Sequence, residues 1–310
     1  MLSKILKGFV ILFTKPNIIG IILLGKFSFL FPDKQYLQMM YWLHLGRKLN
    51  LKNPKTFNEK LQWLKLYNHK PEYTIMVDKV KAKEYVAKLI GEEHIIPTLG
   101  VWDNPDDIDF DALPNQFVLK CNHNSGTGMC ICRDKNKLDI EKVKAKLRKG
   151  LKENYFMRWR EWPYKNVPRR ILAEKFMVDL KQQSDAKSRN QVEELNDYKI
   201  FCFNGEPTIL FVASDRANNV CFDYYDMELN HLDLKQGGDN YYGEVKLPKH
   251  FDEMKELAAK ISKGIPHVRA DFYEINDKVY FGELTFFDSS GFAKFTPEEW
   301  DAKLGSLINI

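Results

Sequence analysis

Cysteine is scarce in this sequence, and neither glycine nor proline is abundant. The chain of 310 residues has five cysteines, an odd number, and no two of them form a C-x-x-C pair. This excludes the disulfide framework of a small secreted protein and a structural zinc site of the usual spacing, and it favours a reducing compartment such as the cytoplasm. The 17 glycines and 13 prolines are too few and too scattered for a collagen-like or low-complexity chain, so we expect a globular protein.

Acidic residues are nearly missing from the first 70 positions. This part holds twelve Lys and Arg against Asp33 and Glu59, a net charge of +10, whereas the whole chain has a net charge of +5. The lysines are interleaved with aliphatic residues and not with the aromatic residues on which bases stack. Nucleic acid is therefore not an expected partner.

The sequence also lacks an uninterrupted apolar run long enough to cross a bilayer. Residues 8–14, 17–25 and 27–31 are apolar, but Lys15, Pro16 and Lys26 interrupt them. A lysine near the bilayer centre costs about 2.5 to 3.5 kcal/mol, and no A-x-A-like cleavage site follows the first run. Two interpretations remain open: residues 1–31 rest on an anionic membrane surface, or they form a helix buried in the fold or in a dimer.

Helical and strand patterns are mixed along the rest of the chain. Thr56, with Glu59 three positions later, predicts a capped helix over 57–67, and a second helix is expected over 72–90. Strand patterns occupy 116–122, 129–133, 169–177, 197–205, 206–214, 219–226, 267–275 and 278–287. Because several neighbouring strands are separated by short turns and form antiparallel hairpins, the expected class is α+β.

The last hairpin carries the most informative charges. Period-two alternation puts Arg269, Asp271 and Tyr273 on one face, and the Asn276-Asp277 turn brings Glu283 beside Asp271. Two adjacent carboxylates repel each other, and a divalent cation such as Mg²⁺ is the usual reason to place them together. The alternative is an ion pair between Arg269 and Glu283 on a solvated face.

Two further segments suggest phosphate and base recognition. In FVLKCNHNSGTG a strand ending in Lys120 leads into a turn with Gly126 and Gly128, whose backbone N–H groups are suited to phosphates. In AEKFM a buried strand with Glu174 runs into a loop where a nucleotide base and ribose fit. A glycine turn by itself is weak support, because glycine also serves turn geometry alone.

These elements, in this order, resemble the ATP-grasp superfamily. From about Asp78 onward the chain looks like the TupA-like branch, through DKVKAKEYV, IGEEHIIPTLGVW, FVLKCNHNSG, DYKIFCFNGEP and VRADFYEINDKVYFGELTFFDSSGF. The resemblance implies an ATP-grasp fold of class α+β, preceded by a helical, basic and apolar N-terminal segment. It also divides the chain into an N-terminal segment (1–70), the first part of the ATP-grasp unit (71–115), a lid subdomain (116–178) and a C-terminal subdomain with the metal-binding hairpin (179–310).

The resemblance further implies roles for single residues. Asp271 and Glu283 would bind Mg²⁺, and Arg269 and Lys120 would be catalytic, acting on the transferred phosphoryl group and the ATP phosphates. The remaining nucleotide contacts implied are the lid loop Ser125, Gly126, Thr127 and Gly128, the adenine hinge Glu174, Lys175, Phe176 and Met177, and the phosphate contact Lys199. Thr285 departs from the family pattern, which has Asn at this place, and this bears on whether one or two Mg²⁺ ions bind.

The activity implied is that of an ATP-dependent carboxylate-amine ligase acting through an acylphosphate, with ATP and Mg²⁺ as cofactors. The TupA-like branch is associated with bacterial surface polymers, including teichuronopeptide and capsular polysaccharide. The implied partners are therefore a carboxylate, such as a uronic acid on a lipid-linked glycan, and an amine. Lipid-linked precursors lie at the inner face of the bacterial membrane, which agrees with a cytoplasmic protein held there peripherally through residues 1–31.

Other functions stay open at this stage. Asp107, Asp109 and Asp111 have the D-x-D spacing that holds a metal and a sugar diphosphate in glycosyltransferases, although an acidic loop is more often simply solvated. An ATP-dependent kinase and a binding protein without catalysis are further alternatives. A glycosyltransferase and a kinase predict products other than an amide, and a binding protein predicts none.

Overall fold

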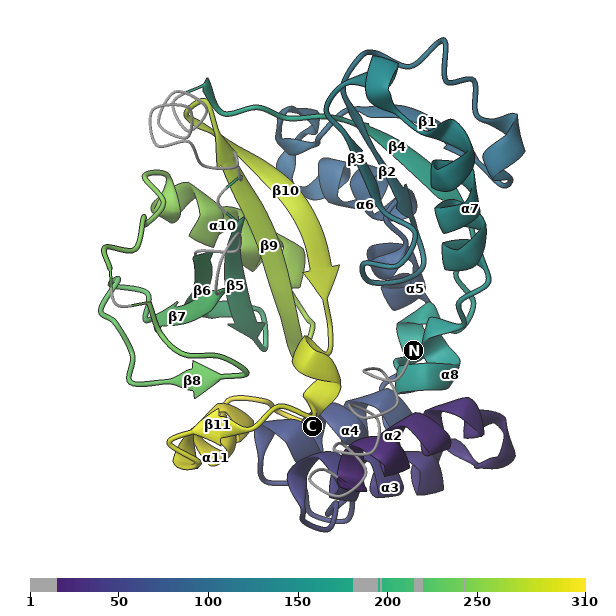
Figure 1. Cartoon of the computed structure of the whole chain (residues 1–310). Coiled ribbons are helices and arrows are strands. Elements are labelled where there is room, and N and C mark those ends of the chain that lie inside the picture. Colours follow the sequence, from purple (N-terminus) through teal and green to yellow (C-terminus); the bar gives the residue numbers. More distant parts are fainter. Residues whose placement is uncertain (1–15, 181–194, 196, 215–219, 242) are drawn as a thin grey trace.

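Two antiparallel sheets stand on either side of the molecule in the computed structural model (Figure 1), which describes residues 16–180, 195, 197–214, 220–241 and 243–310. One sheet has four strands in the order β1-β4-β2-β3, and the other has five in the order β10-β9-β5-β6-β7. Helices lie against both sheets and close one end of the molecule (Figure 1). The expected α+β class is confirmed.

The four-stranded sheet is formed by β1 (Thr98–Trp102), β2 (Phe117–Cys121), β3 (Cys130–Cys132) and β4 (Ile171–Lys175). Phe117 and Leu119 pack with Leu147 of helix α7 (Ile140–Leu151) in one core cluster. Because side chains alternate along a strand, Val118 and Lys120 project from the opposite face. Three short helical turns, η2 (Glu92–His94), η3 (Pro105–Asp107) and η4 (Lys135–Lys137), lie in the surrounding connections.

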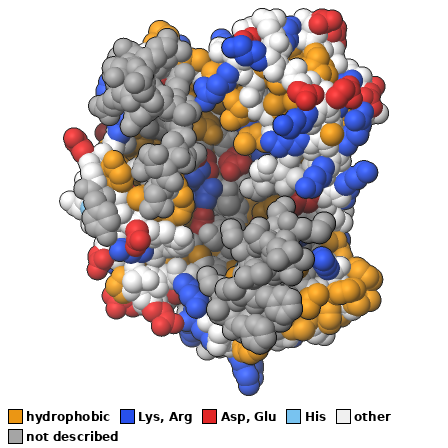
Figure 2. Space-filling model, viewed as in Figure 1, with side chains coloured by type: hydrophobic (Ala, Val, Ile, Leu, Met, Phe, Trp, Pro, Cys, Tyr) orange, Lys and Arg blue, Asp and Glu red, His pale blue; other side chains and the backbone are white. Residues whose placement is uncertain are grey.

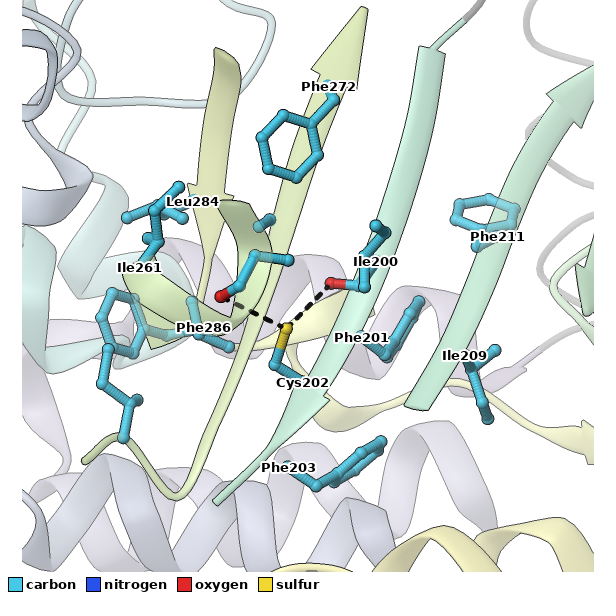
Figure 3. Packing of buried hydrophobic residues seen from close by; sticks show 14 of the residues in the cluster. Ile200, Phe201, Cys202, Phe203, Ile209, Phe211, Ile261, Phe272, Leu284 and Phe286 are labelled. Atoms are coloured by element: carbon cyan, nitrogen blue, oxygen red, sulfur yellow. Dashed lines mark hydrogen bonds between the residues drawn. The ribbon is translucent and has the colours of Figure 1, made fainter. Parts of the chain in front are cut away.

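The five-stranded sheet consists of β5 (Asp197–Phe203), β6 (Glu206–Ser214), β7 (Cys221–Tyr225), β9 (His267–Ile275) and β10 (Lys278–Thr285). One face packs on helix α10 (Phe251–Ser262) through a large buried cluster. Figure 3 shows part of it, with Phe272 and Ile200 on neighbouring strands and the Cys202 thiol donating to backbone carbonyls of Ile200 and Ala258. The opposite face of β9 carries Arg269 and Asp271.

Helices α4 (Phe57–Tyr67), α5 (Pro71–Val77) and α6 (Lys81–Ile90) connect the N-terminal part to the sheets. The predicted cap of α4 is confirmed, because Thr56 and Glu59 form a capping box. The single helix expected over 72–90 is wrong. It is interrupted at Asp78, whose carboxylate accepts hydrogen bonds from Val80 N (2.9 Å) and Asn122 Nδ2 (2.8 Å) and thereby holds the backbone out of helical geometry.

The N-terminal helices form a separate small core with part of the C-terminal half. Helix α2 (Pro16–Lys26) packs on α3 (Asp33–Leu45), and the turn η1 (Ser28–Leu30) adjoins α2. Buried side chains of α2 and α3 form one cluster with Phe292. The opposite side of these elements is exposed and apolar, with Ile18, Ile22, Leu23, Phe27, Phe29, Leu30 and Trp42. The segment is thus buried on one side and open on the other, and residues 1–15 lie outside the described residues.

Most of the remaining elements lie toward the end of the molecule where the C-terminus is marked in Figure 1. They are α8 (Tyr155–Trp159), η5 (Trp162–Tyr164), β8 (Lys235–Gln236), η6 (Asp288–Gly291), β11 (Phe295–Thr296) and α11 (Glu299–Ser306). Helix α11 packs against α4. No helix in the described part of the chain combines the length and apolar character needed to cross a bilayer.

Candidate active site

Three charged side chains line up across three neighbouring strands. The register pairs Lys199 of β5 with Asp271 of β9, and Asp271 with Glu283 of β10. Paired residues of antiparallel strands project from the same face, so these three side chains form one row. A bulge at Gly282 sets this pairing, and a Cβ there would lie 3.0 Å from the Asp271 carbonyl oxygen, which explains the glycine.

The Asp271 carboxylate is held by two cations. Arg269 donates from Nε to Oδ1 (2.7 Å) and from Nη2 to Oδ2 (2.8 Å), and Lys199 Nζ donates to Oδ2 (2.5 Å). Burial raises the pKa of Asp271, against the charges of Arg269 and Lys199, which lower it. Arg269 also pairs with Asp288. The alternative pair between Arg269 and Glu283 is absent from the described residues, because the guanidinium is engaged by Asp271 and Asp288.

A second charged cluster faces this row from the four-stranded sheet. Glu174 of β4 lies between Lys120 Nζ (2.5 Å from Oε2) and Lys83 Nζ (2.7 Å from Oε1). Burial would raise the pKa of Glu174, but the two lysines outweigh it and lower the pKa to about 2. Glu174 therefore stays ionised and orients both lysines.

Two of the lysines at this site, Lys79 and Lys83, were missed by the sequence analysis. Lys79 Nζ donates to the Asn124 carbonyl (2.6 Å) and lies 3.8 Å from Glu283 Oε2, so it links the two charged clusters. The available signal was the run of lysines after Asp78, at positions 79, 81 and 83; in the structure Lys79 precedes α6 and Lys83 lies on it. Burial lowers the pKa of both lysines, and an anion beside them would favour their charged form.

The glycine loop is anchored by the three residues before it. Asn122 bonds to Asp78 and the Pro168 carbonyl, His123 to the Glu153 carbonyl, and Asn124 to the Gly150 carbonyl. Gly128 has φ +75°, and a Cβ there would lie 2.5 Å from Cys121 Sγ and 3.0 Å from Gly150 Cα. Gly128 thus lets the loop approach helix α7.

Two adjoining cavities bring most of these groups together, whereas Asp271 lines neither. The first has a volume of about 190 Å³ and is lined by Lys79, Lys83, Lys120, Ser125, Gly126, Glu174 and Glu283, among others. The second, of about 450 Å³, shares Ser125, Tyr164 and Glu283 with the first and adds Thr127, Arg158, Glu161, Arg269 and Thr285, among others. Figure 2 shows basic and acidic side chains in the hollow between the two sheets.

Not every predicted nucleotide contact lies at these cavities. Lys199 lines a third cavity together with Arg269 and Asp288. The Lys175 backbone N–H donates to the Pro97 carbonyl (3.0 Å), and the Phe176 ring lies 5.3 Å from the Arg133 guanidinium. Neither residue lines the three cavities, and nor does Met177.

The residues fit ATP better than they fit a free metal ion. Three lysines converge on the first cavity, which suits a triphosphate. Among the described residues, no group of three His, Cys, Asp or Glu side chains is arranged to hold a metal. Mg²⁺ is typically held by one or two carboxylates together with phosphate oxygens, so two carboxylates such as Glu283 and Asp271 would meet this requirement if a nucleotide supplied the rest.

The D-x-D aspartates lie elsewhere. Asp109 Oδ1 accepts from the backbone N–H groups of Asp111 (3.0 Å) and Ala112 (3.2 Å), which closes a local turn. None of Asp107, Asp109 and Asp111 lines the three cavities. The Thr285 hydroxyl, at the place of the family's Asn, accepts from Arg269 Nη2 (3.2 Å).

A family model described as TupA-like ATPgrasp matches residues 59–309. No curated protein matches the chain. Among solved structures, it is similar to D-alanine–D-alanine ligase from Bacillus anthracis complexed with ATP, with 13% identity over 68% of this chain and 54% of that one, at a TM-score of 0.39. For D-alanine–D-alanine ligase from Helicobacter pylori the identity is 17% over 81% and 69%, at a TM-score of 0.41. The chain spans about half the length of the Bacillus anthracis ligase.

Proposed function

Because the chain belongs to the TupA-like ATP-grasp family, we propose that it is an ATP-dependent ligase that joins a carboxylate to an amine. The observation that carries the proposal is the meeting of two charged clusters at adjoining cavities. Lys79, 3.8 Å from Glu283, links the three lysines of one cluster to the carboxylates of the other. The alternation of cations and carboxylates suits a nucleotide polyphosphate with its divalent cation.

Each residue then has a defined task. Bound Mg-ATP would supply the phosphoryl group that activates the carboxylate. Lys120, Lys83 and Lys79 bind the phosphates, and Glu174 holds the first two in place. Asp271 and Glu283 are the Mg²⁺ ligands.

Arg269 and the glycine loop act on the phosphoryl group in transfer. Arg269, fixed by Asp271 and Asp288, presents positive charge to this group. The loop from Ser125 to Gly128 covers the site and excludes water.

We propose the second cavity as the place of the acceptor carboxylate. Tyr155, Trp159 and Tyr164 line this cavity with aromatic rings, which suit the C–H surface of a sugar. Arg158, whose guanidinium lies 4.9 Å from the Trp159 ring, lines it too and suits a carboxylate. This combination supports a uronic acid of a bacterial surface-polysaccharide precursor as the substrate.

We also propose that α2, η1 and α3 rest on an anionic lipid surface. Phe29 and Leu30 of η1 are 68% and 63% exposed, and Trp42 of α3 is exposed as well. Figure 2 shows hydrophobic side chains gathered at this corner of the molecule. Exposed Lys26 and Lys34 belong to the same elements, and the first 70 residues carry a net charge of +10. Apolar area together with positive charge fits an anionic membrane, where a lipid-linked substrate would also lie.

One experiment tests the reaction type. The protein is incubated with Mg-ATP, uronic-acid glycans, amino acids and sugar nucleotides, and the products are identified by mass spectrometry together with ADP. An amide-linked product with stoichiometric ADP is expected. A phosphorylated glycan without the amine means a kinase, and a glycoside with ATP untouched means a glycosyltransferase; either result overturns the proposal. The double variant Asp109→Asn, Asp111→Asn should retain activity.

A further inference from the structure

A buried carboxylate outside the phosphate and Mg²⁺ residues opens into the second cavity. Glu161 lies between α8 and η5 and is 3% exposed, yet it lines the cavity together with Arg269 and Thr285. Its Oε1 accepts a hydrogen bond from the hydroxyl of Ser290. Burying a carboxylate is costly, so a group in this position calls for an explanation beyond packing.

Ser290 is held in an unusual backbone conformation. It belongs to η6, where Ser289 and Ser290 have φ values of 48° and 52°, in the left-handed region that non-glycine residues seldom adopt. Two side chains of helix α4 hold this turn in place by hydrogen bonds. Gln62 Nε2 donates to the Ser290 carbonyl (3.1 Å), and Lys65 Nζ donates to the same oxygen (2.8 Å). The Ser290 backbone carbonyl is thus held by α4, and the Ser290 hydroxyl donates to Glu161.

Charged and titratable side chains face Glu161 from four elements packed around it. Lys65 approaches from α4, Asp288 from η6, Tyr155 from α8 and Tyr164 from η5. Burial raises the pKa of the Glu161 carboxyl, Asp288 adds to the rise, and Lys65 and the Ser290 hydroxyl oppose it. A carboxylate with a raised pKa is a better proton acceptor near neutral pH than an ordinary one.

We propose that Glu161, through the hydroxyl of Ser290, accepts the proton that an ammonium group must lose before its nitrogen can attack the activated carboxylate. The inference rests on the proposed ligase function. The amino group arrives as ammonium, and one of its protons passes to Ser290 Oγ while the Ser290 hydroxyl proton passes to Glu161, which leaves a neutral amine. The amine nitrogen then forms a bond to the activated carbonyl carbon, the bond from that carbon to the phosphate oxygen breaks, and phosphate leaves with the electron pair and takes up the second proton lost by the nitrogen. The position fits, because Glu161 and Ser290 share their cavity with Arg269 and Glu283.

Comparing two nucleophiles separates this role from a structural one. Hydroxylamine is unprotonated at neutral pH and needs little help from a base, whereas an amino acid carries an ammonium group. The carboxylate that supports ADP release in the experiment above is combined with either nucleophile, and amide or hydroxamate is measured. Glu161→Gln keeps an acceptor for the Ser290 hydroxyl but takes up no proton. We expect amide formation to fall about a hundredfold, within the range for loss of a general base, and hydroxamate formation to stay within about threefold.

The controls come from the same cavity. Like Glu161→Gln, Ser290→Ala should lose amide formation and keep hydroxamate formation. Glu153→Gln removes a second carboxylate that lines the cavity and should reduce both products to the same extent. An infrared titration of the ligand-free protein should show a carboxyl group of raised pKa that is missing from Glu161→Gln.

The two proposals fail in different ways. If Glu161→Gln and Ser290→Ala, each with a wild-type melting temperature, lose amide and hydroxamate formation equally or lose neither, the inference is overturned and the ligase function stands. If the wild-type protein forms neither product, the ligase function is overturned and the inference with it.

Discussion

Asp271 and Glu283 lie opposite each other in the β9–β10 ladder, yet their side chains are 2% and 41% exposed. Asp271 is bonded to Arg269 and Lys199, whereas Glu283 faces the two cavities and has only Lys79 at 3.8 Å as an ion-pair partner among the described residues. The two proposed Mg²⁺ ligands are therefore unequal. Glu283 is open to an incoming ion, and Asp271 holds the cations around it in place.

The first prediction follows from this inequality. Asp271→Asn removes the carboxylate that Arg269 and Lys199 share, and both cations stay buried. The free energy of unfolding should fall by about 3 kcal/mol, as it does when one partner of a buried ion pair is removed. Glu283→Gln should cost less than about 1 kcal/mol, because the Glu283 side chain is 41% exposed and its one ion-pair partner among the described residues, Lys79, is 3.8 Å away. Both variants should lose ATP-dependent turnover. Denaturant unfolding and ADP release measure the two effects, and equal destabilisation would contradict the distinction.

The second prediction concerns a lysine that binds nucleotide. Lys83→Met should weaken ATP binding about tenfold, because a hydrogen bond between charged groups contributes about 1.5 to 3 kcal/mol and 1.4 kcal/mol is a factor of ten. Lys81→Met is the matched control, since Lys81 is exposed on the same helix. Calorimetric titration with Mg-ATP measures both. Equal affinities of the two variants would remove Lys83 from the nucleotide site.

The sequence predicted the parts of this site that depend on local pattern. Period-two alternation placed Arg269 and Asp271 on one face, and the turn at Asn276 and Asp277 has φ values of 51° and 57°, which these residue types tolerate. The chain's capped helix at Thr56 was equally local. Each of these features is decided within ten residues or fewer.

The parts that were missed depend on contacts between distant segments. Lys79 and Lys83 reach the site only because Asp78, held by Asn122, interrupts the predicted helix. Glu174 was assigned to an adenine hinge, and only the pairing of β2 with β4 reveals its position beside Lys120. Glu161 and Ser290 are 129 positions apart, and no spacing in the sequence links them.

The third prediction is a dependence of stability on pH. The pKa of Glu174 is lowered from 4.5 to about 2 in the folded chain, so its stabilising effect is complete above pH 4.5 and is lost as the pH falls from there toward 2. Glu174→Gln should therefore be less stable than the wild type at pH 7. The difference should narrow by roughly 2 kcal/mol by pH 3, since each pKa unit is worth about 1.4 kcal/mol. Urea unfolding at several pH values tests this, and a constant difference would refute it.

The fourth prediction addresses the membrane surface. The double variant Phe29→Ser, Leu30→Ser should bind phosphatidylglycerol vesicles at least tenfold more weakly, because full burial of such a side chain contributes about 1.5 to 3 kcal/mol. High salt should also weaken the binding of the wild-type protein to the vesicles, because it screens the charges of the lysines. Leu89→Ser, at a side chain 40% exposed on α6, is the control and should bind like the wild type. Equal binding by all three proteins would argue against the proposed surface.

The fifth prediction compares two glycines of the same loop. Gly126 and Gly128 both have positive φ values, 80° and 75°, so alanine at either position costs about 1 to 2 kcal/mol in backbone strain. A Cβ at Gly126 has nothing within 4 Å, whereas one at Gly128 would lie 2.5 Å from Cys121 Sγ and 3.0 Å from Gly150 Cα. Gly128→Ala should therefore destabilise the protein by about 1 to 3 kcal/mol more than Gly126→Ala, the usual cost of overpacking. Denaturant unfolding measures the difference, and equal losses would mean that the loop is free to move away from α7.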